Sequence, residues 1–574
     1  MPYTSKHGEV FVPNVTLTDY VLARADAAPP GATAFTDGPT GRAVAYSSLR
    51  SHISSVAAGL WQRGLRKGEV MAIFMPNHPE YFFAFHGAAS IGAIVTTLNP
   101  VYTSSEIAHQ MSDSGAVFIV TVRALLDKVD GAVAKGAPLR RVLVVDADDA
   151  DEGAHPPRTP FGMLLCDGGS PPRVQIEPSR DTLVIPYSSG TSGLPKGVVL
   201  THSNVVANLQ QISANASLNN MSSDDVVLGV LPFFHIYGMV IVLNFALSRG
   251  AHIVTMPSFD PPLFLRLLKA HAVSILHAAP PIIGFLAKHP SVDAVLPLPR
   301  LREIMSGAAP LGPELASEAM RRLGLRELRQ GYGMTEMSPV SHMMPLGRGG
   351  DCIGSIGELM PSMRCKVVAV DSGCEVGVGE VGELWLAGPN IMQGYLSSPE
   401  ATASTIDAEG YAYDIARVHT RHGPCACSTR ASPPSSRFLH TGDVGFVDTG
   451  GRYFVVDRVK ELIKVKGFQV APAELEAILL SDVRVADAAV IGLPDERSGE
   501  LPKAYVVRQA AHPTLSAEQV KAYVAERTTA YKHLAHVEFV EAVPKSAAGK
   551  ILRKDLRKME DGRRNANGSA RSRL

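Results

Sequence analysis

Residues 187–197 form a run of small and hydroxyl-bearing side chains that could bind phosphate, reading Tyr-Ser-Ser-Gly-Thr-Ser-Gly-Leu-Pro-Lys-Gly. The run follows the apolar residues 183–186 and precedes the apolar residues 198–200. Such a loop between two strands brings backbone N–H groups and hydroxyls close to phosphate oxygens, and Lys196 adds a positive charge. The pattern predicts a triphosphate-binding loop whose contacts are Ser188, Ser189, Gly190, Thr191, Ser192, Gly193 and Lys196.

Two simpler interpretations of this loop are weaker. A Walker A loop is disfavoured because Pro195 precedes Lys196 and the helix that should follow directly is missing. A flexible linker would explain the Ser and Gly content. Linkers seldom lie between two β-rich runs and end on a single lysine, so we favour phosphate binding.

Three later segments carry residue types that suit a nucleotide. In residues 330–336 a Gly-aromatic-Gly turn ends on Glu336, which favours a nucleotide surface beside a metal ion. Asp443 could accept hydrogen bonds from two hydroxyls, and Arg458 offers fixed donors that are always charged. Taken alone, Asp443 and Arg458 are each more typical of an ordinary surface turn or ion pair.

The loop and these segments, in this order, resemble the adenylate-forming superfamily of acyl-CoA synthetases, peptide-synthetase adenylation domains and beetle luciferases. The resemblance runs from about Phe11 to about Lys558. It implies an acid–thiol ligase that uses ATP, Mg²⁺ and coenzyme A: a carboxylic acid becomes an acyl-adenylate, and the acyl group then passes to CoA. A luciferase-like oxygenase would share the first of these steps and stays an alternative.

The resemblance also implies a role for each matching residue. Lys550 would bridge the substrate carboxylate and the α-phosphate, where a cation neutralises developing charge. By itself, a lysine in a glycine turn near a basic terminus is usually solvated and inert. The implied nucleotide contacts are Tyr332 on adenine between Gly331 and Gly333, Thr335 at the α-phosphate, Glu336 holding Mg²⁺, Asp443 at the ribose, Arg458 at the ribose and phosphate, and Gln469 at the adenylate.

The same resemblance implies a hinge at Lys460 and a second catalytic lysine. Lys464 would take part in thioester formation, and Lys466 and Gly467 would line the CoA tunnel. Strand alternation places Lys464 and Lys466 on one face. An exposed edge strand protected by lysines is the alternative interpretation for Lys466.

Residues 456–476 give the strongest resemblance to 4-coumarate:CoA ligases and their relatives. His235 resembles a gate beside the acyl carboxylate, although a lone histidine in an apolar run is often a core residue. Met305 and Val240 replace the Lys and Asn of true 4-coumarate ligases, which favours an apolar fatty or oxylipin-type acid; a genuine 4-coumarate or hydroxycinnamate ligase is the alternative. The implied acyl pocket is Ile236, Tyr237, Val240, Met305, Gly307, Ala308, Gly331, Gly333, Pro339, Val340 and Ser341.

These residues must be positioned by more than one domain, because 574 residues exceed a single hydrophobic core. Strand–helix alternation predicts an α/β fold with two α/β lobes, to which the resemblance adds a small β-barrel-like region. The expected divisions are an AMP-binding N-terminal domain (1–456), a hinge (457–460), a small mobile α+β C-terminal domain (461–558), with helices beginning at Pro472 and Ser516, and a basic, disordered tail (559–574).

Residues 411–438 fit neither a helical nor a strand period and are rich in Ser, Pro and Arg. A long structureless loop is uncommon inside a compact domain. We interpret this segment as an atypical insertion that resembles translated intron. A genuine insertion could instead displace Asp443 and leave a catalytically silent binding homologue.

Charge and targeting patterns limit the partners and the compartment. The 55 basic and 55 acidic residues balance, so nucleic acid is not an expected partner. The apolar run 239–247 is shorter than the roughly 20 residues of a membrane span and predicts a buried helix, and residues 1–30 lack a secretory signal. The six cysteines are expected to be reduced. Ser572, Arg573 and Leu574 resemble a peroxisomal address read by an import receptor; the cytoplasm is the alternative location.

Overall fold

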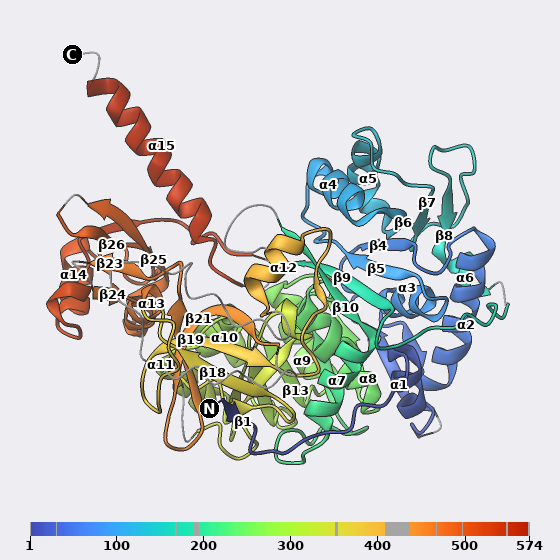
Figure 1. The fold of residues 1–574 in the computed structure, drawn as a ribbon, viewed down its shortest axis with the longest axis horizontal. Coiled ribbons are helices and arrows are strands. Elements are labelled where there is room, and N and C mark those ends of the chain that lie inside the picture. Colours follow the sequence, from blue (N-terminus) through green and yellow to red (C-terminus); the bar gives the residue numbers. More distant parts are fainter. Residues whose placement is uncertain are drawn as a thin grey trace.

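The structure is a computed structural model that describes residues 2–29, 31–166, 169–188, 195–350, 354–407, 437–465, 468–495, 497–546 and 549–571. A large N-terminal part carries three sheets, and a smaller C-terminal domain, orange to red in Figure 1, lies to one side of it. The predicted α/β fold class is confirmed. The boundaries at residues 456 and 460 stay predictions.

The first sheet positions the predicted phosphate loop. Its order is β20-β10-β9-β5-β4-β6-β7-β8, parallel from β9 to β8. All five residues of β4 are buried, as expected for a parallel strand covered on both faces. The strands are β4 (Val70–Phe74), β5 (Ile94–Thr97), β6 (Ala116–Thr121), β7 (Arg141–Val144), β8 (Arg158–Pro160), β9 (Thr182–Ser188), β10 (Lys196–Thr201) and β20 (Gly394–Tyr395); the helices beside them include α2 (Tyr46–Gln62), α3 (Pro79–Ser90), α4 (Ser104–Ser114), α5 (Leu126–Val133) and α6 (Phe161–Cys166).

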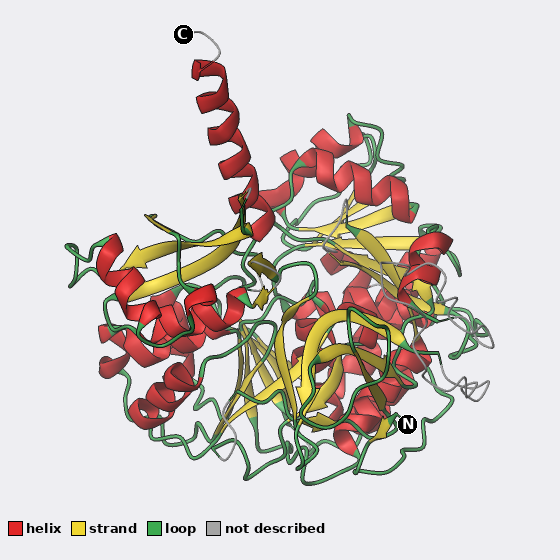
Figure 2. Ribbon diagram, turned by 60° about the vertical axis from the view of Figure 1, so that its left-hand side comes forward, coloured by secondary structure: helices red, strands yellow, loops and turns green. Residues whose placement is uncertain are grey.

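The second sheet carries the predicted acyl-pocket and adenine residues. Its order is β17-β16-β15-β14-β13-β11-β12-β2-β3, and the strands from β15 to β2 are parallel. Figure 2 shows helices packed beside both large sheets. The strands are β2 (Thr33–Asp37), β3 (Ala43–Ala45), β11 (Val226–Gly229), β12 (His252–Thr255), β13 (Ile275–Ala278), β14 (Glu303–Ser306), β15 (Leu328–Gly333), β16 (Val340–Met343) and β17 (Glu358–Leu359); the helices include α1 (Leu17–Ala25), α7 (His202–Ser213), α9 (Pro261–Ala270), α10 (Pro280–Lys288) and α11 (Pro313–Leu323).

The apolar run 239–247 is a buried helix, as predicted, but most of it is π-helical. The π-helix η2 (Gly238–Phe245) continues into α8 (Ala246–Ser248), and every residue of both is buried. Within η2 the Asn244 side chain donates to the carbonyl of Met239 (2.9 Å) and accepts from His86 Nε2 (2.8 Å). π-Helical turns are frequent at functional sites, and this one forms part of the acyl cavity wall described below.

The region expected to be barrel-like is a five-stranded antiparallel sheet, β1-β18-β19-β21-β22, which carries Asp443 and Arg458. Most of the predicted insertion lies outside the described residues, but its flanks meet. Asp407 N donates to Phe438 O (3.0 Å), and Ile406 pairs with Leu439. The elements are β1 (Tyr3–Thr4), β18 (Arg364–Val368), β19 (Gly382–Ala387), α12 (Pro399–Thr405), β21 (Leu439–Val447) and β22 (Tyr453–Arg458).

The C-terminal domain has its own sheet and its own apolar core. Helix α13 begins at Pro472 and α14 follows the Ser516 capping box, both as predicted. Its elements are β23 (Ile463–Val465), β24 (Phe468–Val470), α13 (Pro472–Ser481), β25 (Val485–Asp495), β26 (Gly499–Arg508), α14 (Ala517–Ala525), β27 (His536–Phe539) and α15 (Arg553–Arg571).

Two predictions about the chain's chemistry and tail are corrected. The tail expected to be disordered is helical as far as Arg571, because α15 continues through it and projects from the domain (Figure 1). Buried Glu560 anchors this helix by accepting from Lys503 Nζ (2.6 Å) and Tyr505 OH (2.7 Å). Cys374 is disulfide-bonded, contrary to the expected reduced thiol, whereas buried Cys365 is free. Within the described ranges no helix is long and apolar enough to cross a membrane.

Candidate active site

The ends of the phosphate loop are held by a β-hairpin. Strands β9 and β10 pair antiparallel, with Ser188 opposite Lys196. The predicted contacts Ser189, Gly190, Thr191, Ser192 and Gly193 lie outside the described residues, so their roles stay predictions. The Lys196 ammonium lies 5.0 Å from the centroid of the Tyr395 ring, where the ring face attracts a cation.

Glu336 faces this hairpin from the second sheet. Thr335 begins the short 3₁₀ turn that carries it. Its Oε1 accepts from Ser188 Oγ and from Tyr395 OH, both at 2.9 Å, and the side chain is buried. Mg²⁺ is often held by one or two carboxylates together with substrate phosphates, so a carboxylate beside a phosphate loop fits that ion.

Asp443 joins the predicted adenine and ribose residues. It is buried and accepts a 2.5 Å hydrogen bond from Tyr332 OH through Oδ2, while Arg458 Nε lies 3.1 Å from Oδ1. Asp443 and Arg458 are direct partners in the β21–β22 register. Each carboxylate oxygen can still accept a further hydrogen bond, so the pair remains able to receive ribose hydroxyls.

Lys550 reaches the same place from the C-terminal domain. The preceding Gly549 has φ +80°, and a Cβ there would lie 3.2 Å from Ala279 and Pro281 of the N-terminal part, so the turn packs closely. Burial and nearby Arg458 lower the pKa of Lys550 to about 8, against the opposing effect of Asp443, Glu461 and Glu336. This structure therefore brings Lys550 among the nucleotide-site residues.

His235 lies between Lys550 and the acyl cavity. Burial and then the charge of Lys550 lower the pKa of His235 to about 4, so the imidazole is neutral near pH 7. Its Nδ1 accepts from the Tyr237 backbone N–H (3.4 Å), which leaves the ring proton on Nε2. The position agrees with the predicted gate, and the role itself stays a prediction.

The residues predicted for thioester formation lie elsewhere in this structure. Lys464 is exposed on β23 and pairs with Gln469 of β24, and its backbone N donates to Glu500 Oε2 (2.8 Å). Lys460 is exposed in the turn that follows β22. Lys466, Gly467 and the Gln469 side chain lie outside the described atoms.

An apolar cavity opens beside His235, and most of the predicted acyl residues line it. Val240 and Ser341 do not. Among the side chains of η2, Ile241 and Phe245 line the cavity and Val240 does not, and strand alternation turns Ser341 away from its neighbour Val340. The predicted residues that line it are Ile236, Tyr237, Met305, Gly307, Ala308, Gly331, Gly333, Pro339 and Val340.

Sequence reasoning missed the rest of this lining. On β14 and β15 the missed side chains Glu303 and Arg329 continue the alternation of the predicted Met305 and Gly331. That period of two was the available signal. The other missed residues are Ile212, Asn219, Met221, Ile241, Phe245, Ile275, His277, Met334 and Met343, and the cavity also includes the predicted His235 and Tyr332.

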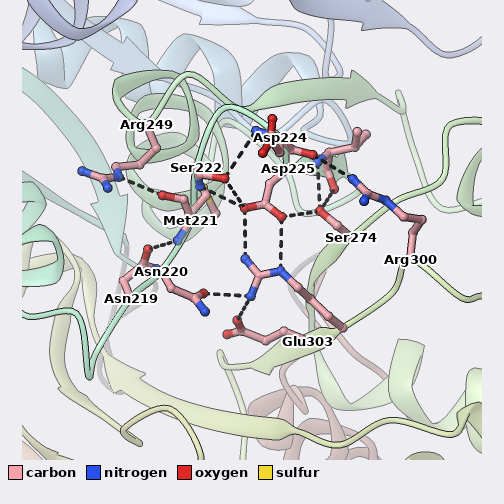
Figure 3. Close-up of polar contacts among 12 residues, drawn as sticks. Asn219, Asn220, Met221, Ser222, Asp224, Asp225, Arg249, Ser274, Arg300 and Glu303 are labelled. Carbon is pink, nitrogen blue, oxygen red and sulfur yellow. Dashed lines mark hydrogen bonds and ion pairs between the residues drawn. The ribbon is translucent and has the colours of Figure 1, made fainter.

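Glu303 and Arg329, which line the cavity, belong to a polar network. Arg329 is 1% exposed; it pairs with Glu303 Oε1 (Nε at 2.9 Å) and donates to the carbonyls of Leu218 and Met344, each at 2.8 Å. The network continues from Glu303 through the guanidinium of Arg302, which donates to Asp225 Oδ2 at 3.0 Å. Figure 3 shows Glu303 and Asp225 joined to one guanidinium group. The charge and the hydrogen-bond donors of Arg329 are satisfied by protein groups, so Arg329 has a structural role.

The comparisons with known proteins agree with this geometry. Residues 22–396 match the model of the AMP-binding enzyme family, and residues 474–550 match that of the AMP-binding enzyme C-terminal domain. The chain is 40% identical to 4-coumarate–CoA ligase 1 of Petroselinum crispum over 526 residues, which is 91% of this chain and 90% of that protein. It is 41% identical over 527 residues to 4-coumarate–CoA ligase 1 of Solanum tuberosum, with the same shares covered.

Among solved structures, ATP-bound MatB from Rhodopseudomonas palustris has a TM-score of 0.79 at 25% identity, covering 95% of this chain and 99% of that one. The match therefore extends over both the N-terminal part and the C-terminal domain. The chain belongs to the AMP-binding enzyme family, as an ATP-dependent acid–CoA ligase of the 4-coumarate–CoA ligase-like type.

Proposed function

We propose that the protein converts a carboxylic acid to its acyl-adenylate with MgATP, releasing pyrophosphate, and then transfers the acyl group to CoA, releasing AMP. The observation that carries this proposal is the convergence of Lys550, Glu336 and the Asp443–Arg458 pair beside an acyl cavity. The C-terminal domain supplies Lys550, and the N-terminal part supplies the other groups. A movement of one domain against the other can therefore bring Lys550 into the site or remove it.

In the first step the acid attacks the α-phosphate of ATP, and the protein acts mainly by positioning and by neutralising charge. Lys550 would lie between the two anions, Thr335 would contact the α-phosphate, and the 188–196 loop would hold the triphosphate. Glu336 would hold Mg²⁺, which supplies further neutralisation of phosphate charge when bound. Asp443 and Arg458 would fix the ribose, and Tyr332 would stack on adenine.

In the second step we propose that the C-terminal domain turns about Lys460, withdraws Lys550 and presents the face of Lys464. The CoA thiol would then attack the mixed anhydride and expel AMP, with Gln469 contacting the adenylate and Lys466 and Gly467 lining the CoA tunnel. The exposed position of Lys464 supports this proposal, because a residue used only after rotation should stand away from the nucleotide site beforehand.

For the acid we propose a fatty or oxylipin-type molecule. Met305 supports this, since it lines the cavity where true 4-coumarate ligases have lysine. Val240 does not support the choice of an apolar acid, because it does not line the cavity. The alternative is a genuine 4-coumarate or hydroxycinnamate ligase.

An acid panel tests this substrate proposal. Medium-chain and cyclopentanone-bearing fatty acids should drive faster pyrophosphate release than 4-coumarate does, because the cavity walls are mostly apolar. Rates are measured at equal ATP and CoA, with the acid-free reaction as the control. A clear preference for 4-coumarate would replace the proposed substrate by the alternative.

The alternative of a silent binding homologue is disfavoured by the contacts that flank residues 408–436. The Asp407–Phe438 hydrogen bond and the His440–Asp407 pair (2.8 Å) hold the two flanks of this segment next to each other. Asp443, a few residues later, keeps its register with Arg458. The position of Asp443, the residue proposed to bind the ribose, is therefore set by contacts that do not involve residues 408–436.

We also propose delivery to peroxisomes through Ser572, Arg573 and Leu574, which would bind the import receptor. The reason is a terminal tripeptide with the small–basic–leucine order of that address. An amino-terminally labelled chain should coincide with a peroxisomal marker in cells, and a chain lacking these three residues should be cytoplasmic. Equal distributions of the two chains would reject the address.

A further inference from the structure

His277 lines the acyl cavity, and one of its ring nitrogens has no hydrogen-bond partner among the described residues. The residue lies on β13, lines the cavity and is only 5% exposed. Its Nδ1 lies 3.1 Å from Tyr237 OH, whereas its buried Nε2 has no hydrogen-bond partner among the described residues. A buried polar atom without a partner is costly, so this nitrogen is either a defect or a contact reserved for a ligand.

The ring is neutral and is held firmly. Burial and then the charge of Arg329 lower the pKa of His277 to about 3. The Tyr237 ring that orients it packs on Gly307, where a Cβ would lie 2.7 Å from Tyr237 Cε1. An imidazole fixed in this way has a defined direction for its second nitrogen.

Tyr237 allows that nitrogen either polarity. If Tyr237 OH donates to His277 Nδ1, then Nε2 carries the proton and donates. If Tyr237 OH donates instead to Met305 O, at 3.4 Å, then Nδ1–H donates to the phenol oxygen and Nε2 accepts. The site can therefore match a keto oxygen or a hydroxyl group.

Among the neighbouring cavity residues compared below, His277 is the suitable polar contact for the body of an acyl chain. Ile236, Ile275 and Met305 are apolar walls. The nearby Arg329 is already paired with Glu303 and with two backbone carbonyls. A mostly apolar pocket with a few placed polar groups is the usual design for fixing a ligand's orientation.

We propose that His277 Nε2 hydrogen-bonds a keto or hydroxyl oxygen on the apolar body of the acid, so that oxygenated acids are selected over plain hydrocarbon acids of the same shape. This inference rests on the proposed ligase function and narrows its substrate class. His277 is a specificity residue in it, and the chemistry at the carboxylate is left to Lys550.

The test compares two acids that differ in one oxygen: an octanoic acid carrying a cyclopentanone ring and its cyclopentane counterpart. The wild-type chain should show a kcat/KM ratio of at least about tenfold in favour of the ketone. His277→Leu should bring this ratio close to one, mainly through a loss with the ketone, and His277→Gln, which keeps a polar amide, should retain part of it.

His271→Leu is the matched control, because it makes the same substitution shortly before β13 at a residue that does not line the cavity. It should keep the wild-type ratio. A wild-type ratio near one, or an unchanged ratio in His277→Leu, overturns the inference while leaving the ligase function intact. If His277→Leu does not fold, the wild-type ratio alone decides. Failure of every acid to support AMP formation would instead remove the proposed function itself.

Discussion

Replacing Lys550 with alanine is expected to slow acyl-adenylate formation by about 10²–10³-fold, the usual effect of removing one group that stabilises transition-state charge. Thioester formation from a supplied acyl-adenylate should change little, because Lys550 is proposed to leave the site before that step. Acid-dependent pyrophosphate release measures the first reaction, and CoA-thioester formation from synthetic acyl-adenylate measures the second.

The charge state of Lys550 gives this prediction a second readout. Its pKa is lowered to about 8, so the required cation is present below that pH and is lost as the pH rises through it. The kcat/KM of adenylation, which reports groups of the free enzyme, should therefore decline above about pH 8. Lys550→Arg stays charged and should lose this decline even if its maximal rate is lower.

The control is Lys558→Ala, which removes a lysine of α15 whose side chain is 69% exposed. It should keep the wild-type rate and pH profile. An adenylation rate for Lys550→Ala close to that of Lys558→Ala would contradict the role assigned to Lys550, as would the same alkaline decline in Lys550→Arg.

Replacing Asp443 with alanine is expected to raise the KM for ATP by about 10²-fold. The change removes the acceptor proposed for the ribose hydroxyls and strands two donors, Tyr332 OH and Arg458, at a buried position. Charged hydrogen bonds contribute roughly 1.5–3 kcal/mol each, and every 1.4 kcal/mol is about tenfold in affinity. Asp443→Asn keeps the shape of the side chain without its charge, so its KM for ATP should lie between those of the wild type and Asp443→Ala.

Asp448→Asn provides a matched control, because Asp448 follows the same strand, β21, and also pairs with an arginine, Arg452 (2.7 Å). It should leave the KM for ATP unchanged. Thermal unfolding of all variants separates lost binding from lost folding. A folded Asp443→Ala protein with the wild-type KM for ATP would reject the ribose assignment.

The sequence predicts the groups of the nucleotide site better than it predicts their surroundings. Local sequence motifs contain Lys550, Asp443 and Arg458, so these residues could be predicted from the sequence. Tyr395 was missed because β20 meets β10 only through pairing across the first sheet, a long-range contact with no local signature.

The errors in the acyl cavity have local physical causes. Val240 was assigned from the resemblance to 4-coumarate:CoA ligases, whereas the side chains of the π-helical η2 that line the cavity are Ile241 and Phe245. His277 stands on a buried strand, where a lone histidine looks like any core residue. Only the contact with Tyr237 and the unpartnered Nε2 distinguish it.

The central claim is that the chain joins an acid to CoA through an acyl-adenylate. The most direct measurement incubates the full-length protein with ATP, Mg²⁺, CoA and the preferred acid of the panel, and quantifies AMP, pyrophosphate and acyl-CoA together. We predict acid-dependent formation of all three in equal amounts. When CoA is omitted, one initial turnover should release pyrophosphate and leave acyl-adenylate, without release of AMP. Cleavage of ATP to ADP and phosphate, or no acid-dependent cleavage with any acid, would contradict the account.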